Sequence, residues 1–493
     1  MLALFFQNLI FFQNSIRTVV FASCAIFFLC FLCPSLAQAS EIGTSLPIWS
    51  VFPFVGILFS IALFPVWAPK IWHIHFGKIS AFWALVFAIP FLFFYQEIAF
   101  NEILHIIVLD YIPFIILLWG LFTVSSGIVI RGKFNGTPIF NTTTLLIGTL
   151  LASCIGTTGA SIVMIRPLLR ANKDRIHRTH IVCFFIFLVA NIGGSLTPLG
   201  DPPLFLGFLH NVPFFWVTIN LFPTMFFTVT ILLVLFYFMD IHFYRKETEL
   251  HKVVLHKTKT KIHIDGAYNL IFLLGIVVVL LTSSYWKVSA VNVFGISVSY
   301  QSILRDIAII VLGIISLSVT PKILHKANEF SWLAIIEVAK LFIGIFITII
   351  PVLAILKAGS AGALANFVNS VETPMEYFWA SGILSSFLDN APTYLVFFNM
   401  ALGHTGITEA QIPVTLTLGA KTTGQAFISF LRAISLGTVF MGAMTYIGNA
   451  PNFMIRTIAK EAGVKLPSFF GYMFKYSIPI LIPVLILVSF IFF

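Results

Sequence analysis

The sequence predicts an all-α polytopic membrane protein of two inverted repeats, with about ten transmembrane helices, two opposed re-entrant hairpins and two broken helices. First, 59 % of its 493 residues are hydrophobic and only 9 % are charged, whereas soluble domains carry about 25 % charged residues. Second, clusters of glycine and proline interrupt two of the apolar runs. Third, a single set of crossings places all the basic loops on one side of the bilayer, as the positive-inside rule requires.

The N-terminal segment, residues 1–39, has the pattern of a cleavable signal peptide. Arg17 precedes an apolar core over residues 18–32, and Ala37-Gln38-Ala39 offers a cleavage site of small residues. An additional retained helix is the alternative, but the apolar core is short for a membrane span. The five cysteines show neither a disulfide framework nor a metal-ligand spacing, so we expect no resident cofactor.

The first repeat, residues 40–241, opens with three ordinary spans. They are predicted at 47–67, 79–96 and 103–130. The loop Lys70–Lys78 and the segment Arg131-Gly132-Lys133 are basic, while the loop Gln96–Glu102 is acidic. The positive-inside rule therefore places the two basic segments in the cytoplasm and the acidic loop outside. Asp110, about two turns inside the third span, is a candidate for a proton path.

Residues 141–170 are predicted to form the first re-entrant hairpin. Basic residues precede this apolar stretch and follow it, so both of its ends belong in the cytoplasm. Gly156-Thr157-Thr158-Gly159, near its middle, is where the chain can turn back. A turn at membrane depth is tolerated only where it lines a protein-buried cavity.

The first broken helix is predicted at residues 180–210. Its centre, NIGGSLTPLGDPPLFL at 191–206, contains three glycines and three prolines that cannot share one continuous helix. Asp201 lies in the middle of this break, and a charged residue there argues against exposure to lipid. The chain then returns through 213–240 to a basic segment, 242–266, which is predicted to be a cytoplasmic linker.

The second repeat, residues 267–493, follows the same plan upside down. Ordinary spans are predicted at 267–285, 303–320, 332–356 and 475–493. A second hairpin, 374–403, should enter from outside, because its flanks carry glutamate and histidine but no lysine or arginine. A second broken helix is predicted at 433–455. The hairpin tips, Thr157–Ser161 and Asp389–Thr393, occupy equivalent places in the two repeats.

The two breaks match each other residue by residue. MTYIGNAPNFM at 444–454 aligns with LTPLGDPPLFL at 196–206, which pairs threonine with threonine, glycine with glycine and Asn449 with Asp201. Two broken spans at corresponding places in two halves indicate the binding site of a secondary transporter. The candidate site residues are Thr157, Thr158, Ser161, Thr197, Gly200, Asp201, Asp389, Asn390, Thr393, Thr445, Gly448 and Asn449.

At these breaks the chain resembles the ion-transporter superfamily of arsenite permeases, citrate carriers and NhaD-type sodium/proton antiporters. The residues that carry the resemblance are NIGGSLTPLGDPP at 191–203, SFLDNAPT at 386–393 and AMTYIGNAPNF at 443–453. The stretches 433–454 and 465–473 look like a bacterial subgroup described as sodium/proton antiporters or citrate carriers. The resemblance implies two inverted repeats, a homodimer and an elevator-like motion.

The site chemistry favours a cation as the cargo. Asp201 and Asp389 are the two carboxylates at the breaks, and amide and hydroxyl oxygens surround them in sequence, which suits the hard ion Na⁺. Burial disfavours the charged form of a carboxylate, so a proton can compete for the same site. We therefore predict sodium/proton antiport. The alternatives are cation-coupled citrate or dicarboxylate transport, in which Asp201 holds the coupling ion, or efflux of an oxyanion.

Other classes of function are not favoured. The net charge of +10 comes from short loops between spans and reports orientation, so no nucleic-acid partner is expected. No nucleophile–base pair, metalloprotease motif or phosphate loop stands out, so an enzyme is not expected. The expected partners are a small ion or small molecule and the lipid bilayer, in the inner membrane of a bacterium.

Overall fold

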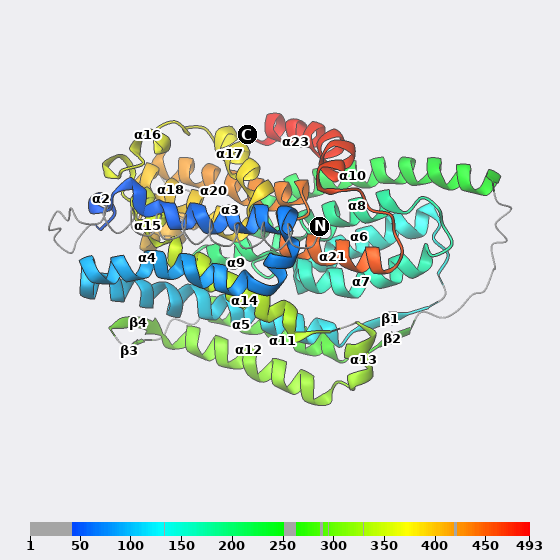
Figure 1. Ribbon diagram of the computed structural model, residues 1–493, viewed down its shortest axis with the longest axis horizontal. Helices are drawn as coiled ribbons and strands as arrows, with labels where there is room; N and C mark the ends of the chain where they lie inside the picture. Colours follow the sequence, from blue (N-terminus) through cyan, green and yellow to red (C-terminus); the bar gives the residue numbers. More distant parts are fainter. Residues whose placement is uncertain are drawn as a thin grey trace, which may run out of the picture.

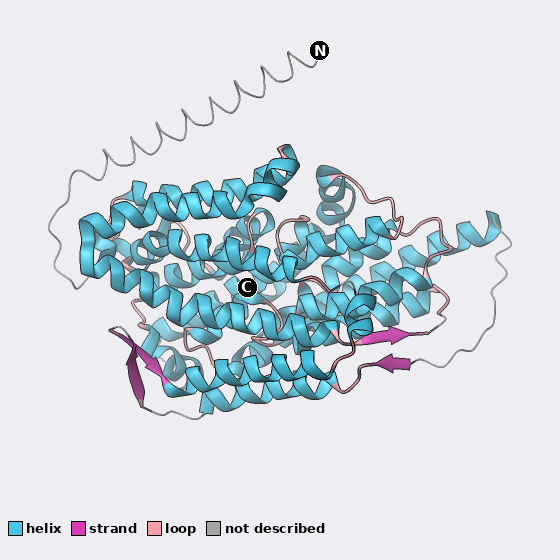
Figure 2. Cartoon of the chain, turned by 60° about the horizontal axis from the view of Figure 1, so that its bottom comes forward, coloured by secondary structure: helices cyan, strands magenta, loops and turns pink. Residues whose placement is uncertain are grey.

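The computed structural model describes residues 42–132, 134–250, 263–285, 289–293, 295–328, 330–418 and 422–493. The predicted signal peptide lies outside these residues, as does the central part of the predicted linker, 251–262. Most of the described chain is helical, and the two small sheets lie at opposite ends of the helical body (Figure 2).

Within the described residues, eight helices are long and apolar enough to cross a membrane by length and composition. The number rises to nine if the bent pair Ile335–Thr348 and Ile350–Lys357 is counted as one span. One of the eight stretches, Ile74–Ser126, has 53 residues and contains a break at Gln96, where φ is 45° and ψ is −114°. This arrangement confirms the predicted class, an all-α polytopic membrane protein.

One group of helices, here called the α12 group, packs around α5 and α14. Its members are α3 (Phe52–Trp67), α4 (Pro69–His105), the π-helical turn η2 (Ile106–Tyr111), α5 (Ile112–Ser126), α11 (Asn269–Tyr285), α12 (Tyr300–Val319) and α14 (Trp332–Thr348). The apolar window of α12 is only 22 % buried inside the protein, so most of this helix faces outward. An exposed apolar helix of this kind suits contact with lipid.

A second group, here called the α20 group, contains both predicted breaks and both predicted hairpins. Its first half comprises α6 (Pro138–Ile155), α7 (Thr157–Ala171), α8 (Thr179–Leu188), η3 (Ile192–Leu196), α9 (Pro202–Leu209) and α10 (Phe214–Leu250). Its second half comprises α15 (Ile350–Lys357), α17 (Pro374–Phe387), α18 (Asn390–Thr405), α20 (Thr422–Met441), η6 (Gly442–Met444), α21 (Ala450–Glu461), α22 (Phe469–Tyr472), η7 (Met473–Ser477) and α23 (Ile478–Phe492).

The two broken segments lie in the interior of the protein. The apolar window that contains α8 is 89 % buried, and the window that contains α20 is 83 % buried. Helices that are apolar on all sides belong in such a position. Backbone groups freed at the breaks therefore face protein rather than lipid, which offers them no hydrogen bonds.

Short elements cover the two ends of the molecule (Figure 1). Strands β1 (Val129–Arg131) and β2 (His263–Asp265) pair antiparallel at one end, and β3 (Ala290–Val293) and β4 (Ile296–Ser299) pair antiparallel at the other. The remaining short helices are α2 (Ile42–Ser45), η1 (Ile48–Val51), α13 (Lys322–Ala327), η4 (Gly359–Ala361), α16 (Ala365–Val368), η5 (Glu409–Gln411) and α19 (Ile412–Leu418). The sequence prediction contained none of the four strands.

Several predicted boundaries were wrong because charge and polarity were taken to end helices. The basic segment Lys70–Lys78 is helical and forms the start of α4. The helix does break at Gln96, where the predicted second span ends, but the rest of the predicted loop Gln96–Glu102 is helical. The second broken segment begins at Thr422 rather than at residue 433, and α10 continues to Leu250, into the predicted linker. Polar residues can extend a helix beyond the bilayer when no glycine or proline stops it.

Segments predicted to be cytoplasmic contact one another. Arg131 and Asp265 pair at 2.5 Å across the β1–β2 ladder. Arg178, in the loop before α8, donates from Nη2 to the carbonyl oxygen of Gly463 at 2.9 Å. Loops from both halves of the chain thus meet at the end of the molecule that carries β1 and β2.

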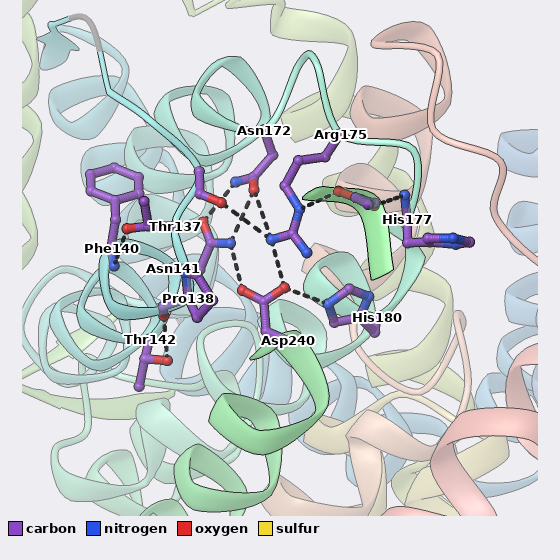
Figure 3. Close-up of polar contacts among 12 residues, drawn as sticks. Thr137, Pro138, Phe140, Asn141, Thr142, Asn172, Arg175, His177, His180 and Asp240 are labelled. Carbon is purple, nitrogen blue, oxygen red and sulfur yellow. Dashed lines mark hydrogen bonds and ion pairs between the residues drawn. The ribbon is translucent and has the colours of Figure 1, made fainter. Parts of the chain in front are cut away.

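A buried polar cluster fixes the α6–α7 pair to α10 (Figure 3). Asp240, on α10, lies 2.6 Å from Nη1 of Arg175 and accepts from Asn141 Nδ2 at 2.8 Å. Its Oδ1 also lies 2.8 Å from Nε2 of His180, at the start of α8. Asn172 and Asn141 exchange two hydrogen bonds, of 2.7 and 3.0 Å. The start of α6 and the loop after α7 are therefore attached to one carboxylate.

Replacement of this carboxylate should destabilise the fold strongly. We expect Asp240→Asn to cost about 3–5 kcal/mol, because it leaves the buried Arg175 guanidinium without its closest counter-charge. The matched control is Asp265→Asn, which removes a half-exposed aspartate from an arginine pair and should cost about 1 kcal/mol or less. The comparison is the thermal unfolding midpoint of the purified variants in detergent. Equal midpoints for the two variants would contradict the structural role of Asp240.

Candidate functional site

Four helices begin at one place, where the two predicted breaks meet the two predicted hairpin tips. The residues that precede them are Gly156 before α7, Asp201 before α9, Asp389 before α18 and Asn449 before α21. A helix N-terminus carries free N–H groups and the positive end of the helix dipole. The site is therefore electropositive through its backbone.

The local sequence leaves the side chain of Asp201 free for other contacts. Pro202 and Pro203 occupy the first two positions of α9 and carry no N–H, and the Leu204 N–H donates to the backbone oxygen of Asp201. The carboxylate makes no capping hydrogen bond to its own helix. An aspartate at this position usually caps the helix, so its use elsewhere distinguishes Asp201 from an ordinary cap.

Asp201 instead accepts hydrogen bonds from three other segments. Oδ1 accepts from Thr157 Oγ1 at 3.0 Å and from Asn449 Nδ2 at 2.9 Å. Oδ2 accepts from Asn390 Nδ2 at 2.8 Å. The residue is 1 % exposed. One buried carboxylate thus joins the starts of α7, α9, α18 and α21 and holds them together.

The two predicted threonines make matching contacts in the two halves. Thr197 Oγ1 donates to the carbonyl oxygen of Ser153, and Thr445 Oγ1 donates to that of Ser386 at 2.5 Å. Each serine lies three residues before the start of the turn, at Gly156 and at Asp389. Each threonine also accepts from the backbone N–H two residues later, at 3.2 Å in both cases. The two halves therefore hold their breaks against their hairpins in the same way.

The two predicted glycines stand where backbone segments nearly touch. A Cβ added at Gly200 would lie 2.0 Å from the carbonyl oxygen of Gly194, and one added at Gly448 would lie 2.6 Å from that of Gly442. The Gly200 carbonyl oxygen also accepts from the Thr157 N–H at 2.7 Å. These positions require glycine for space rather than for a positive φ.

The remaining predicted residues lie around the site without bonding to Asp201. Asp389 caps α18 through the Ala391 N–H at 3.2 Å, and Thr393 donates to the backbone oxygen of Asp389 at 3.0 Å. Ser161 is fully buried and its Oγ has no hydrogen-bond partner among the described residues. Thr158 is half-buried at the start of α7. The structure therefore brings Thr157, Asn390 and Asn449 to Asp201, but not these four.

The predicted pairing of the two hairpin tips was shifted by one residue. Gly156 and Asp389 are the corresponding residues that precede α7 and α18. Thr157 and Asn390, the first residues of the two helices, both donate to Asp201. Gly156 has a φ of 80°, which favours glycine, and Asp389 has an extended backbone. The two tips therefore correspond by their place in the fold, although their backbone shapes and their sequences differ.

Two further asparagines, Asn191 and Asn452, lie behind Asn449 and were not among the residues predicted from the sequence. Asn449 Nδ2 lies 3.0 Å from the Ala190 carbonyl oxygen and 3.2 Å from Asn191 Oδ1. Asn191 Nδ2 donates to Asn452 Oδ1 at 2.8 Å, and Asn452 Nδ2 donates to Gly442 O at 2.8 Å. Asn191 and Asn452 stand inside the two break motifs, but they are not at matching positions, and a residue-by-residue pairing therefore passed over them.

The charged side chains at the site are the carboxylates of Asp201 and Asp389. Within the described ranges, no lysine or arginine forms an ion pair with Asp201 or Asp389. Arg432, on α20, donates instead to the carbonyl oxygen of Phe492 at 2.7 Å. The groups that surround the Asp201 carboxylate are neutral amides and a hydroxyl.

Comparison with known families identifies the class of protein. Residues 43–493 match the model of a family described as putative citrate transport. The chain belongs to this family. A comparison with curated proteins finds no match. Membership in the citrate-transport family establishes a multi-pass membrane transporter of the citrate-transport type, and it agrees with the expectation that the chain is not an enzyme.

Proposed function

We propose that this member of the citrate-transport family exchanges Na⁺ or Li⁺ for H⁺ at Asp201. The single observation that carries the proposal is the buried Asp201 carboxylate, which has only neutral partners. A buried charge without a counter-charge is costly. A metal cation or a proton bound at Asp201 would supply that counter-charge, and the two would compete for the same oxygens.

The oxygen atoms around Asp201 support a hard cation. Na⁺ prefers carboxylate, amide and carbonyl oxygens. Asn449 Oδ1 is buried, and among the described residues it has no hydrogen-bond partner, while the Nδ2 atom of the same side chain faces three acceptors. We infer that Asn449 Oδ1 and Asp201 are cation ligands, with Asp389 at the half-buried rim of the site.

Cation-coupled citrate transport is the second candidate. It is favoured by the four helix N-termini that converge on the site, because the positive ends of their dipoles, and the N–H groups that proline and local hydrogen bonds leave free, attract carboxylates. It also agrees with the family description. In this scheme Asp201 would hold a coupling cation beside the anionic substrate. Arsenite-like oxyanions would need the same N–H groups, without a role for Asp201 as an ion ligand.

We further propose a homodimer in the inner membrane of a bacterium and an elevator-like movement of the α20 group against the α12 group. Both follow from the resemblance noted in the sequence. The division of the helices into these two groups supports the second, because the hairpins and breaks all belong to one of them.

Everted membrane vesicles test the two candidates directly. The full chain is expressed in a bacterial strain that lacks its own sodium/proton antiporters, and a dye reports the pH gradient across the vesicle membrane. Addition of Na⁺ or Li⁺ should collapse the gradient, while K⁺ and vesicles from cells with an empty vector should show no response. Uptake of radiolabelled citrate with no response to Na⁺ or Li⁺ would overturn the antiport proposal and support the second candidate.

A further inference from the structure

A second cluster of charged side chains lies at the other end of α9 from Asp201. His210, which follows α9, lies with Nδ1 3.0 Å from Glu409 Oε2 and with Nε2 3.4 Å from Asp110 Oδ1. Glu409 also pairs with Lys357 Nζ at 2.9 Å. His210 is 9 % exposed and Asp110 is 4 % exposed. None of these residues takes part in the site around Asp201.

This cluster crosses the boundary between the two groups of helices. Asp110 belongs to the π-helical turn η2, next to α5 in the α12 group, whereas His210 ends α9 in the α20 group. Glu409 belongs to η5 and Lys357 ends α15. Phe398 of α18 packs beside the imidazole at 5.7 Å between ring centroids. His210 is therefore a direct link between the helix that follows Asp201 and the other group.

The geometry favours a doubly protonated imidazole, because each ring nitrogen faces a carboxylate. A neutral histidine has one N–H and one lone pair, so one of its nitrogens would present a lone pair to a carboxylate oxygen. The imidazolium carries an N–H on each nitrogen and a positive charge. It donates from Nδ1 to Glu409 and forms an ion pair through Nε2 with Asp110 at 3.4 Å, without a hydrogen bond. It also balances the buried charge, because the carboxylates of Asp110 and Glu409 then face the two cations Lys357 and His210. His105, at the end of α4, is the other titratable group that faces Asp110.

The buried cluster of Figure 3 has the same composition but a different geometry. It contains one histidine, two carboxylates and one permanent cation: His180, Asp240, Glu247 and Arg175. Only Nε2 of His180 faces a carboxylate, and the N–H of a neutral ring satisfies that contact. All of its members lie on α8, on α10 or in the loop before α8. It therefore does not connect the two groups and does not require a proton.

We propose that Asp110, His210 and Glu409 form a proton-binding site, separate from the cargo site, whose proton holds α9 against η2. Helix α9 is eight residues long, about 12 Å at 1.5 Å per residue, and joins this proton site to Asp201. Loss of the proton leaves a lone pair against a buried carboxylate and releases the end of α9. Protonation thereby controls how firmly the helix that follows the cargo site is attached to the α12 group.

Hydrogen–deuterium exchange of the purified full chain in lipid nanodiscs tests this proposal without any cargo. Rates are divided by those of an unfolded reference to remove the intrinsic effect of pH. Two facing carboxylates favour the charged imidazole, so His210 should keep its proton at about pH 6 and lose it only towards about pH 10. Between these two pH values, exchange in α9 and η2 should rise about tenfold. In His210→Gln and in Asp110→Asn, exchange should be fast at both pH values.

The matched control is His180→Gln, which removes another buried histidine beside a carboxylate and should keep the wild-type pH dependence of α9. A tenfold rise that persists in His210→Gln would overturn the proposal, and so would its loss in His180→Gln. No Na⁺ or citrate is involved, so the outcome is independent of the vesicle assay and of the cargo that it identifies.

Discussion

Asp201→Asn should abolish transport while leaving a folded protein. The exchange removes the charge at the centre of the site and keeps the size and planarity of the side chain. We expect transport to fall at least about 100-fold, which corresponds to a loss of about 3 kcal/mol of ion binding. The expectation holds for both candidate functions, because Asp201 holds the exchanged cation in one and the coupling cation in the other.

The new amide also disturbs the hydrogen bonds of the site. An asparagine presents one oxygen and one NH₂ group, whereas Asp201 accepts through both of its oxygens. One donor on α7, α18 or α21 would then face another donor, and an unsatisfied buried donor costs about 1–3 kcal/mol. The unfolding midpoint should therefore fall, but by less than expected for Asp240→Asn.

The measurement is the vesicle assay with the cargo that the wild-type chain accepts, together with the amount of protein in the membrane. The control is Asp174→Asn, which changes an exposed aspartate in the loop between α7 and α8 and should transport normally. Transport by Asp201→Asn within about threefold of the wild type would contradict a role in ion binding, because a lost buried charge should cost far more.

The sequence was sufficient for the helical class and for the location of the breaks. Glycine and proline interrupt a helix through backbone geometry alone, so the breaks near Asp201 and Asn449 could be found without any tertiary information. The correspondence of Thr197 with Thr445 and of Gly200 with Gly448 could be found because the two residues of each pair make equivalent local contacts in the two halves. Asp201 stood out as a carboxylate within a break and beside two prolines.

The contacts between segments could not be obtained in this way. That Thr157 and Asn390 meet one carboxylate depends on how two hairpins fold towards one break, and composition does not encode this. The same holds for His210 and Asp110, which are 100 residues apart in the chain and belong to different helix groups. Helix ends near Lys70 and Thr422 were misplaced for another reason, because a charged or polar residue marks the edge of a membrane but does not end a helix.

Gly200→Ala should disrupt the site more than any other single methyl group in the breaks. The added Cβ would lie 2.0 Å from the carbonyl oxygen and 2.7 Å from the carbonyl carbon of Gly194. These are backbone atoms, so no change of side-chain rotamer relieves the clash. The break would have to separate, and the hydrogen bond from the Thr157 N–H to the Gly200 oxygen would be lost with it. Overpacking in a closed interior costs about 1–3 kcal/mol or more.

Two further alanine variants allow the effects of an added methyl group to be ranked against that of Gly200→Ala. Gly448→Ala meets the Gly442 oxygen at 2.6 Å, a longer contact, and should lower transport and the unfolding midpoint less than Gly200→Ala. Gly77→Ala, inside α4, meets only the flexible side chain of Lys340 at 3.1 Å and should stabilise that helix by up to about 1 kcal/mol. Transport and thermal unfolding of the three variants should follow this order. Normal transport by Gly200→Ala would contradict this expectation. It would mean that transport does not depend on the close contact between Gly194 and Gly200 that places Asp201 in the site.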